Sequence, residues 1–182
     1  MSEVTQQDWA DTLACKIRER SVRVGVIGLG YVGLSLAVEF AKSGLQVTGI
    51  EIDADKVARL RSGESYVQDV KPYEVKGLIA DEKLLVMDDF DRLGELDAVS
   101  ICVPTPLSKT KDPDISYIAA ATKEIVTHLL PGQLIVLEST TYPGTTDEVI
   151  LPELQKTGLQ VGQEFFLAFS PERIDPGNAQ YT

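Results

Sequence analysis

The chain has little cysteine, histidine or positive charge, and each shortage excludes a class of function. Its two cysteines, Cys15 and Cys102, provide no disulfide framework, and Cys102 lies in an apolar run where a buried free thiol is expected. The only histidine, His128, falls late in a helical pattern, so neither a metal site nor a Ser-His-Asp triad is expected. With 17 basic against 28 acidic residues the net charge is −11, which argues against nucleic acid as a partner.

Long apolar runs are also missing. No stretch approaches the ~18 apolar residues of a membrane span, and residues 1–20 are polar and lack the apolar centre of a signal peptide. We therefore expect a cytoplasmic protein without a membrane partner. What remains is 182 residues, 43% of them hydrophobic and 25% charged, which is typical of one α/β domain with a sizeable core.

A glycine-rich turn is the most informative feature that is present. In residues 22–53 an apolar run ends in the letters GLGYVG, a helical pattern follows, and a second apolar run ends at Glu51. Gly28 allows a tight turn, Gly30 lets a pyrophosphate approach the backbone, and Gly33 lets the helix pack against the strand. A turn that only connects strand and helix is the alternative. The strand-helix-strand context with an acid at its end favours a dinucleotide site.

The acid also indicates which dinucleotide binds. A carboxylate at Glu51 accepts hydrogen bonds from both adenosine-ribose hydroxyls and repels a 2′-phosphate, whereas an NADP site usually has an arginine nearby. The nearest cations, Lys56 and Arg59, lie one or two turns into the following helix. NAD is therefore the expected cofactor, with Asp53 as the second candidate acid. At this end of the cofactor the expected contacts are Gly28, Gly30, Tyr31, Val32, Gly33, Glu51, Asp53 and Lys56.

The hydropathy pattern predicts a Rossmann-type α/β fold, a doubly wound parallel sheet of six strands in the order 3-2-1-4-5-6 with helices on both faces. Apolar runs predict strands at residues 22–27, 45–50, 83–87, 97–103, 133–138 and 164–169. Helical patterns lie at residues 32–43, 54–61, 73–80, 115–130 and 146–157, and residues 62–72 are expected to form a loop. A separate amphipathic helix is predicted at residues 3–19, with Trp9, Leu13 and Ile17 as its apolar stripe.

Polar loops follow the last three predicted strands, at the sheet edge where ligands of open α/β sheets bind. Val103, Pro104 and Thr105 form a stiff turn that could line a nicotinamide ribose or simply be rigid. In residues 138–146 the hydroxyls of Ser139 and Thr140 could hold a water or a sugar hydroxyl.

Helix capping is the alternative role for this second loop, and Thr145 or Thr146 is expected to supply the cap. Asp114 is a further candidate cap, for the helix predicted at residues 115–130. The third loop places Glu172 beside Arg173, either as a functional carboxylate or as an ordinary surface ion pair.

Four motifs together resemble the UDP-glucose/GDP-mannose dehydrogenase family, most closely its branch that oxidises UDP-N-acetylhexosamines. They read GVIGLGYVGLSLAVEFAKSG, CVPTPL, ESTTYPGTT and SPERIDPGN, in the family's order, within residues 25–178. The resemblance implies oxidation of the C6 alcohol of a UDP-sugar to a uronic acid for polysaccharide biosynthesis, with two NAD and a cysteine-bound thiohemiacetal. It implies that Thr140 positions the catalytic water and that Glu172 assists acid–base chemistry. Val103, Pro104, Thr105, Ser139 and Thr140 then complete the expected cofactor contacts.

The sequence departs from the family pattern at two places. The UDP-glucose branch has a second glutamate where this chain has Pro176, which favours the N-acetyl-sugar branch. The family's catalytic lysine, asparagine, cysteine and aspartate all follow the position of Thr182. The resemblance therefore implies a leading helix at 1–20 and an NAD-binding domain at 21–182, without the central helix and the sugar-binding domain, and inactive alone.

In its complete form the protein is expected to be a homodimer or larger. Two other readings remain open on the sequence. The chain could be the cofactor domain of a 2-hydroxyacid or 6-phosphogluconate-type dehydrogenase, or a non-enzymatic NAD-sensing module.

Overall fold

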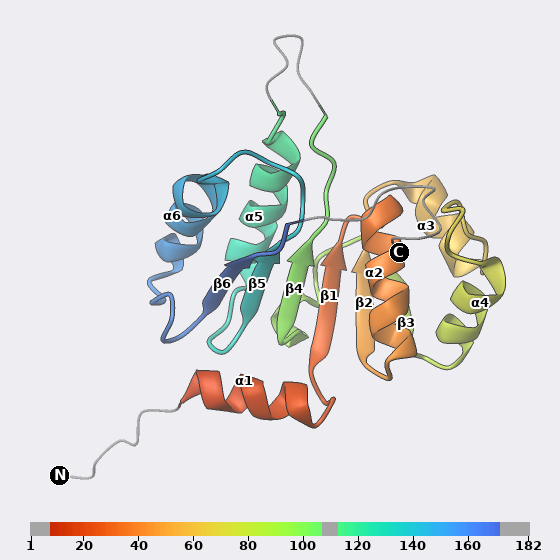
Figure 1. Cartoon of the computed structure of the whole chain (residues 1–182), viewed down its shortest axis with the longest axis horizontal. Helices are drawn as coiled ribbons and strands as arrows, with labels where there is room; N and C mark the ends of the chain where they lie inside the picture. The colour runs from red at the N-terminus through yellow and green to blue at the C-terminus, as the bar shows by residue number, and fades with distance from the viewer. Residues whose placement is uncertain (1–7, 107–112, 172–182) are drawn as a thin grey trace.

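The computed structural model describes residues 8–106 and 113–171, and it confirms the predicted fold class (Figure 1). A six-stranded parallel sheet has the order β3-β2-β1-β4-β5-β6. Its strands are β1 (Arg23–Ile27), β2 (Gln46–Ile50), β3 (Leu84–Met87), β4 (Ala98–Ile101), β5 (Leu134–Leu137) and β6 (Phe166–Phe169). The chain order reverses between β1 and β4, so the edge above these two strands is the switch point at which ligands of such sheets bind.

Strand register brings the ends of the central strands to one level. Ile27 of β1 pairs with Ile50 of β2 on one side and with Ile101 of β4 on the other. The residues that follow these three positions are Gly28, Glu51 and Cys102, so they meet at the same edge of the sheet. The predicted strand at 97–103 is shorter than expected, and Cys102 lies just beyond its end while still being buried.

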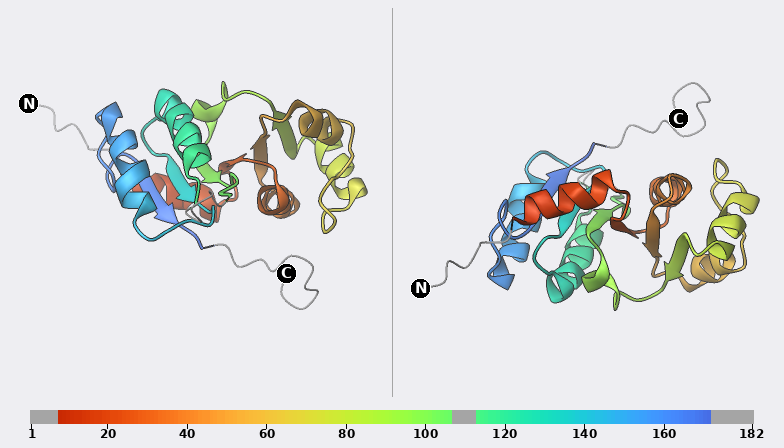
Figure 2. Two further views of the ribbon diagram at one scale, coloured as in Figure 1. Left: turned by 90° about the horizontal axis from the view of Figure 1, so that it is seen from above. Right: turned by 90° about the horizontal axis from the view of Figure 1, so that it is seen from below.

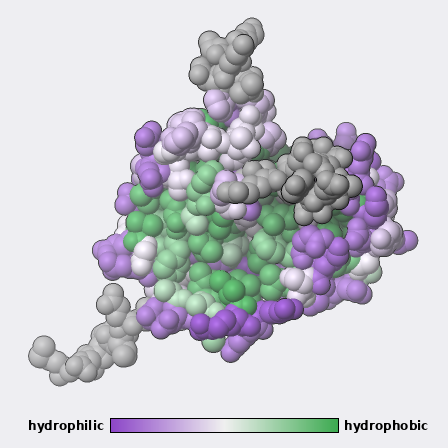
Figure 3. Space-filling view, viewed as in Figure 1, coloured by the Kyte–Doolittle hydropathy of each residue, from purple (hydrophilic) through white to green (hydrophobic). Residues whose placement is uncertain are grey.

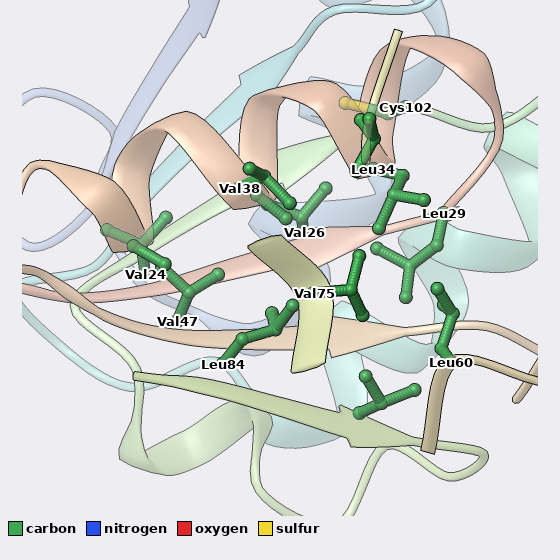
Figure 4. Packing of buried hydrophobic residues seen from close by; sticks show 14 of the residues in the cluster. Val24, Val26, Leu29, Leu34, Val38, Val47, Leu60, Val75, Leu84 and Cys102 are labelled. Carbon is green, nitrogen blue, oxygen red and sulfur yellow. The ribbon is translucent and has the colours of Figure 1, made fainter. Parts of the chain in front are cut away.

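Helices cover the sheet on two sides (Figure 2). Their bounds are α1 (Trp9–Arg18), α2 (Tyr31–Lys42), α3 (Ala54–Arg61), α4 (Pro72–Ala80), α5 (Ser116–His128) and α6 (Leu151–Leu154). One core joins α2, α3 and α4 to β1, β2 and β3, and Figure 4 shows Leu34 and Val38 of α2 packed near Val26 of β1. A second core lies between α5, α6 and the other side of the sheet. None of the described helices is long and apolar enough to cross a membrane.

Helices cover both faces of the sheet as predicted, but the coverage is uneven. α5 and α6 lie behind β4, β5 and β6 in Figure 1, and no described helix covers the front of β5 and β6. Figure 3 shows apolar residues gathered on this front face. Leu134 of β5 and Phe166 of β6 are only partly buried on this face.

The leading helix α1 lies across the amino ends of the strands (Figure 1). Leu13 is buried, whereas Ile17 is 49% exposed, so the predicted three-residue stripe is wrong at its last member. Each step of four residues rotates about 40° around a helix, so Ile17 has turned about 80° away from Trp9. Asp97 anchors the helix, because its carboxylate lies 2.6 Å from Lys16 Nζ and accepts a hydrogen bond from the Arg23 backbone N–H at 2.8 Å.

The segment predicted as one helix at 146–157 consists of three short pieces. A π-helix (Thr146–Ile150) leads into α6, and a 3₁₀-helix (Gln155–Thr157) follows. Pro152 at the start of α6 lacks a backbone N–H, which interrupts the regular hydrogen-bond ladder.

The expected caps also differ from the prediction. Thr145 makes no side-chain cap bond, because its hydroxyl donates to the Tyr142 carbonyl at 2.9 Å. Before α5, the Asp114 carboxylate does accept from the Ser116 N–H at 2.9 Å, although Ile115 occupies the N-cap position.

Candidate dinucleotide site

The three glycines of the turn between β1 and α2 are required for different reasons. Gly28 has φ +88°, and a Cβ there would lie 2.8 Å from the Cys102 carbonyl oxygen. A Cβ on Gly33 would lie 1.8 Å from the Gly28 carbonyl oxygen. A Cβ on Gly30 would meet no atom within 4 Å. The fold therefore demands glycine at two positions, while at Gly30 an added side chain would meet no atom of the domain.

The amino end of α2 faces this open space without a cap. Gly30 is the N-cap residue and supplies no side-chain hydrogen bond, and no acidic residue lies in the first turn, which begins with Tyr31 and Val32. The first N–H groups of a helix have no partner within it, and the helix dipole adds positive potential there. This end of α2 is therefore suited to an anion such as a pyrophosphate.

Glu51 lies beside the turn, directly after β2. Its side chain is buried, and its carboxylate accepts hydrogen bonds from the backbone N–H groups of Leu29 and Asp53, each at 3.1 Å. Each carboxylate oxygen has about two acceptor sites, so capacity remains for ribose hydroxyls. Lys56 Nζ lies 3.6 Å from Glu51 Oε2. The sequence places Lys56 in the following helix and counts it among the expected cofactor contacts, and the structure shows that the first turn of α3 brings its ammonium beside the end of β2.

Asp53 has a structural task in this arrangement. It is the N-cap of α3, and its carboxylate accepts from the backbone N–H groups of Asp55 at 3.0 Å and Lys56 at 3.3 Å. Of the two acids, Glu51 is therefore the one beside the glycine turn and Asp53 is the one that begins the next helix.

Hydroxyl groups join the loops that follow β4 and β5. Ser139 is buried, and its hydroxyl donates to the Val103 carbonyl at 2.7 Å. Thr105 Oγ1 donates to the Thr140 carbonyl at 2.6 Å. Pro104 and Thr140 are exposed at this edge. The structure thus brings Val103, Thr105, Ser139 and Thr140 into one assembly beside the switch point, whereas Glu172 lies outside the described residues.

Two features of the site were missed by sequence reasoning. Ser100 and Glu138 are hydrogen-bonded across β4 and β5, and Cys102 Sγ lies 3.8 Å from the same carboxylate oxygen of Glu138. Tyr66, from the loop before α4, donates its hydroxyl proton to the Leu29 carbonyl at 2.6 Å. The signal for Tyr66 was a single aromatic residue in the loop at residues 62–72. Among the described residues no three His, Cys, Asp or Glu side chains come together as a metal site.

Fold and geometry together define a Rossmann-type dinucleotide-binding domain: an uncapped helix end beyond a glycine turn, a carboxylate at the end of the second strand, and loops at the switch point. Residues 22–182 match the model of the UDP-glucose/GDP-mannose dehydrogenase family, NAD binding domain. The chain belongs to this family, as its NAD-binding domain.

Relatives agree with this assignment. A UDP-N-acetyl-D-glucosamine 6-dehydrogenase from Pseudomonas aeruginosa is 37% identical over 163 residues, which are 89% of this chain and 38% of that protein. The structure of a UDP-D-ManNAc dehydrogenase from Pyrococcus horikoshii is 36% identical, with a TM-score of 0.80 over 85% of this chain and 37% of that one. An NDP-N-acetyl-D-galactosaminuronic acid dehydrogenase from Methanosarcina mazei Go1 is 34% identical, with a TM-score of 0.80 over 91% and 38%. The chain therefore spans less than two fifths of these relatives.

Proposed function

We propose that this domain binds NAD across the switch point and that the complete protein oxidises the C6 alcohol of a UDP-N-acetylhexosamine to the uronic acid. The uncapped end of α2 beside the open space at Gly30 carries the cofactor part of the proposal. The relatives named above act on N-acetylated nucleotide sugars, which supports the substrate part.

The residues of this chain divide the binding of NAD among them. The N–H groups at the start of α2 hold the pyrophosphate, with Tyr31 and Val32 in the first turn. Glu51 accepts hydrogen bonds from the adenosine ribose. Its neighbour Lys56 supplies a compensating positive charge at 3.6 Å. When bound, NAD supplies the hydride acceptor of the reaction.

The loops after β4 and β5 position the reacting end. Val103, Pro104 and Thr105 line the nicotinamide ribose, and the bond from Ser139 to Val103 fixes the shape of that wall. Thr140 lies exposed on the adjoining loop, where its hydroxyl can orient a water for hydrolysis of a covalent intermediate. Glu172 takes or returns a proton during oxidation, and the nucleophilic cysteine comes from the remainder of the complete protein, which we expect to assemble as a dimer or larger.

Turnover of a UDP-sugar panel by the complete protein tests this function. We expect NADH from a UDP-N-acetylhexosamine and little from UDP-glucose, and no NADH from the 182-residue chain alone. Preferred turnover of UDP-glucose would contradict the substrate assignment. NADH formation by the isolated domain would contradict the proposal that the nucleophilic cysteine comes from the remainder of the complete protein.

A carboxylate variant tests the proposed acid–base role in the complete protein. Replacing Glu172 with Gln keeps the shape and removes the base, so kcat should fall about 10²- to 10⁴-fold while NAD affinity is retained. Arg173→Gln is the matched control, because it removes the neighbouring charge only. If Glu172→Gln leaves kcat within about two-fold, the pair is an ordinary surface ion pair.

A further inference from the structure

Leu29, the residue between the first two glycines of the turn, is held on both of its backbone polar groups by side chains. Its N–H donates to Glu51 Oε2 at 3.1 Å, and its carbonyl accepts from the Tyr66 hydroxyl at 2.6 Å. The Leu29 side chain is fully buried. Because the two clamping side chains come from separate segments, the orientation of the peptide groups next to Gly30 is fixed by tertiary contacts.

Two cations, Lys56 and Arg59, lie beside the Tyr66 side chain that holds Leu29. Lys56 Nζ lies 5.8 Å and Arg59 Cζ 5.5 Å from the centre of the Tyr66 ring. Lys56 also lies 3.6 Å from the Glu51 carboxylate that holds the Leu29 N–H. Contacts of this kind between a cation and a ring are worth about 0.5–1 kcal/mol at exposed sites, so they restrain the ring without burying the charge.

Tyr66 also faces the space that Gly30 leaves open. Together with Gly30, Tyr31, Lys56, Val67 and Gln68, it lines a pocket of about 440 Å³. Burial raises the pKa of the Tyr66 phenol, and the carboxylates of Glu51 and Asp53 raise it further, against a smaller lowering by Arg59. The hydroxyl therefore stays protonated and remains a donor at physiological pH.

We propose that Tyr66 is a positioning residue for the cofactor: its hydrogen bond to Leu29 presets the glycine turn in the shape that receives the pyrophosphate. The proposal rests on the proposed binding of NAD at this turn. A turn that is already in its bound shape loses less conformational freedom on binding. The alternative is that the bond only ties the loop at 62–71 to the domain and has no bearing on the ligand.

Calorimetric titration of the 182-residue chain with NAD, ADP and adenosine distinguishes these roles. Tyr66→Phe removes the hydroxyl and keeps the ring with its cations. We expect NAD and ADP to bind about five- to tenfold more weakly, the equivalent of one lost hydrogen bond, with adenosine affinity unchanged because adenosine has no phosphate. Tyr73→Phe is the matched control, since Tyr73 in α4 is 74% exposed.

Each outcome bears on a different claim. Unchanged NAD affinity in Tyr66→Phe, or an equal loss for adenosine, would overturn the positioning role. Absence of NAD binding by the unmodified chain would instead refute the proposed function. Amide hydrogen exchange guards against a folding defect: faster exchange confined to Leu29 and Gly30 supports the proposal, whereas faster exchange throughout the domain contradicts it.

Discussion

Gly30 and Gly33 should respond differently to an added side chain: we expect the one at Gly33 to lower the unfolding free energy and the one at Gly30 to leave it nearly unchanged. Gly33→Ala places a Cβ 1.8 Å from the Gly28 carbonyl oxygen, where ordinary contact begins at 3.4 Å. Both partners belong to packed backbone, so we expect a loss of at least about 3 kcal/mol in unfolding free energy. Gly30→Val meets no atom of the domain and has φ −69°, which any residue adopts, so stability should stay within about 1 kcal/mol.

At Gly30 the valine should affect NAD binding strongly although it affects stability little. The valine occupies the space proposed for the pyrophosphate, so NAD should no longer stabilise the variant. In the unmodified chain, NAD at 100 times its Kd adds about 2.7 kcal/mol. For a chain of this size that raises Tm by about 5–11 °C. Thermal unfolding followed by circular dichroism, with and without NAD, measures both quantities. A full NAD-induced shift in Gly30→Val would show that the pyrophosphate does not occupy the space beside Gly30. An undiminished Tm in Gly33→Ala would show that the junction tolerates a Cβ at this position.

Three further variants test the surroundings of the turn. Glu51→Gln should weaken NAD about tenfold and narrow its advantage over NADP, because the amide loses the charge that repels a 2′-phosphate; competitive titration measures both. Asp97→Asn should lower the urea-unfolding free energy by about 1–3 kcal/mol and leave NAD affinity unchanged, since Asp97 anchors α1 at the far edge of the sheet. The Lys71 N–H and then Lys42 hold the pKa of Glu74 below its usual value. The stability that Glu74 contributes is therefore fully present above its unfolded pKa of about 4.3 and is lost as pH falls through the lowered folded pKa. In Glu74→Gln, the free energy of urea unfolding should depend less on pH across this range.

The sheet and the placement of the candidate-site residues at its edge were predictable because both depend on local patterns. Apolar runs of strand length alternate with helical periods, and the glycine turn can only follow a strand and begin a helix. Glycine is required at Gly28 and Gly33 because a Cβ at either position would clash with neighbouring backbone. Glu51 was predictable for the same reason, since it is the residue after a buried strand.

What the sequence could not supply depends on tertiary approach. The position of Lys56 in the following helix gave no distance to Glu51, and the turn into α3 brings its ammonium to 3.6 Å from that carboxylate. The contact from Tyr66 to Leu29 joins segments 37 positions apart. Ile17 recurs at helical spacing, but its side chain is exposed. For Lys56 and Tyr66 the decisive quantity was a distance between elements, which periodicity does not encode, whereas Ile17 is exposed because eight residues rotate it about 80° away from Trp9.

Isothermal titration of the unmodified 182-residue chain with NAD and then NADP tests whether this domain binds NAD at the end of α2 beside Glu51. We expect one saturable NAD site per chain and weaker binding of NADP. No measurable NAD binding, or NADP binding as tight as NAD, would contradict it.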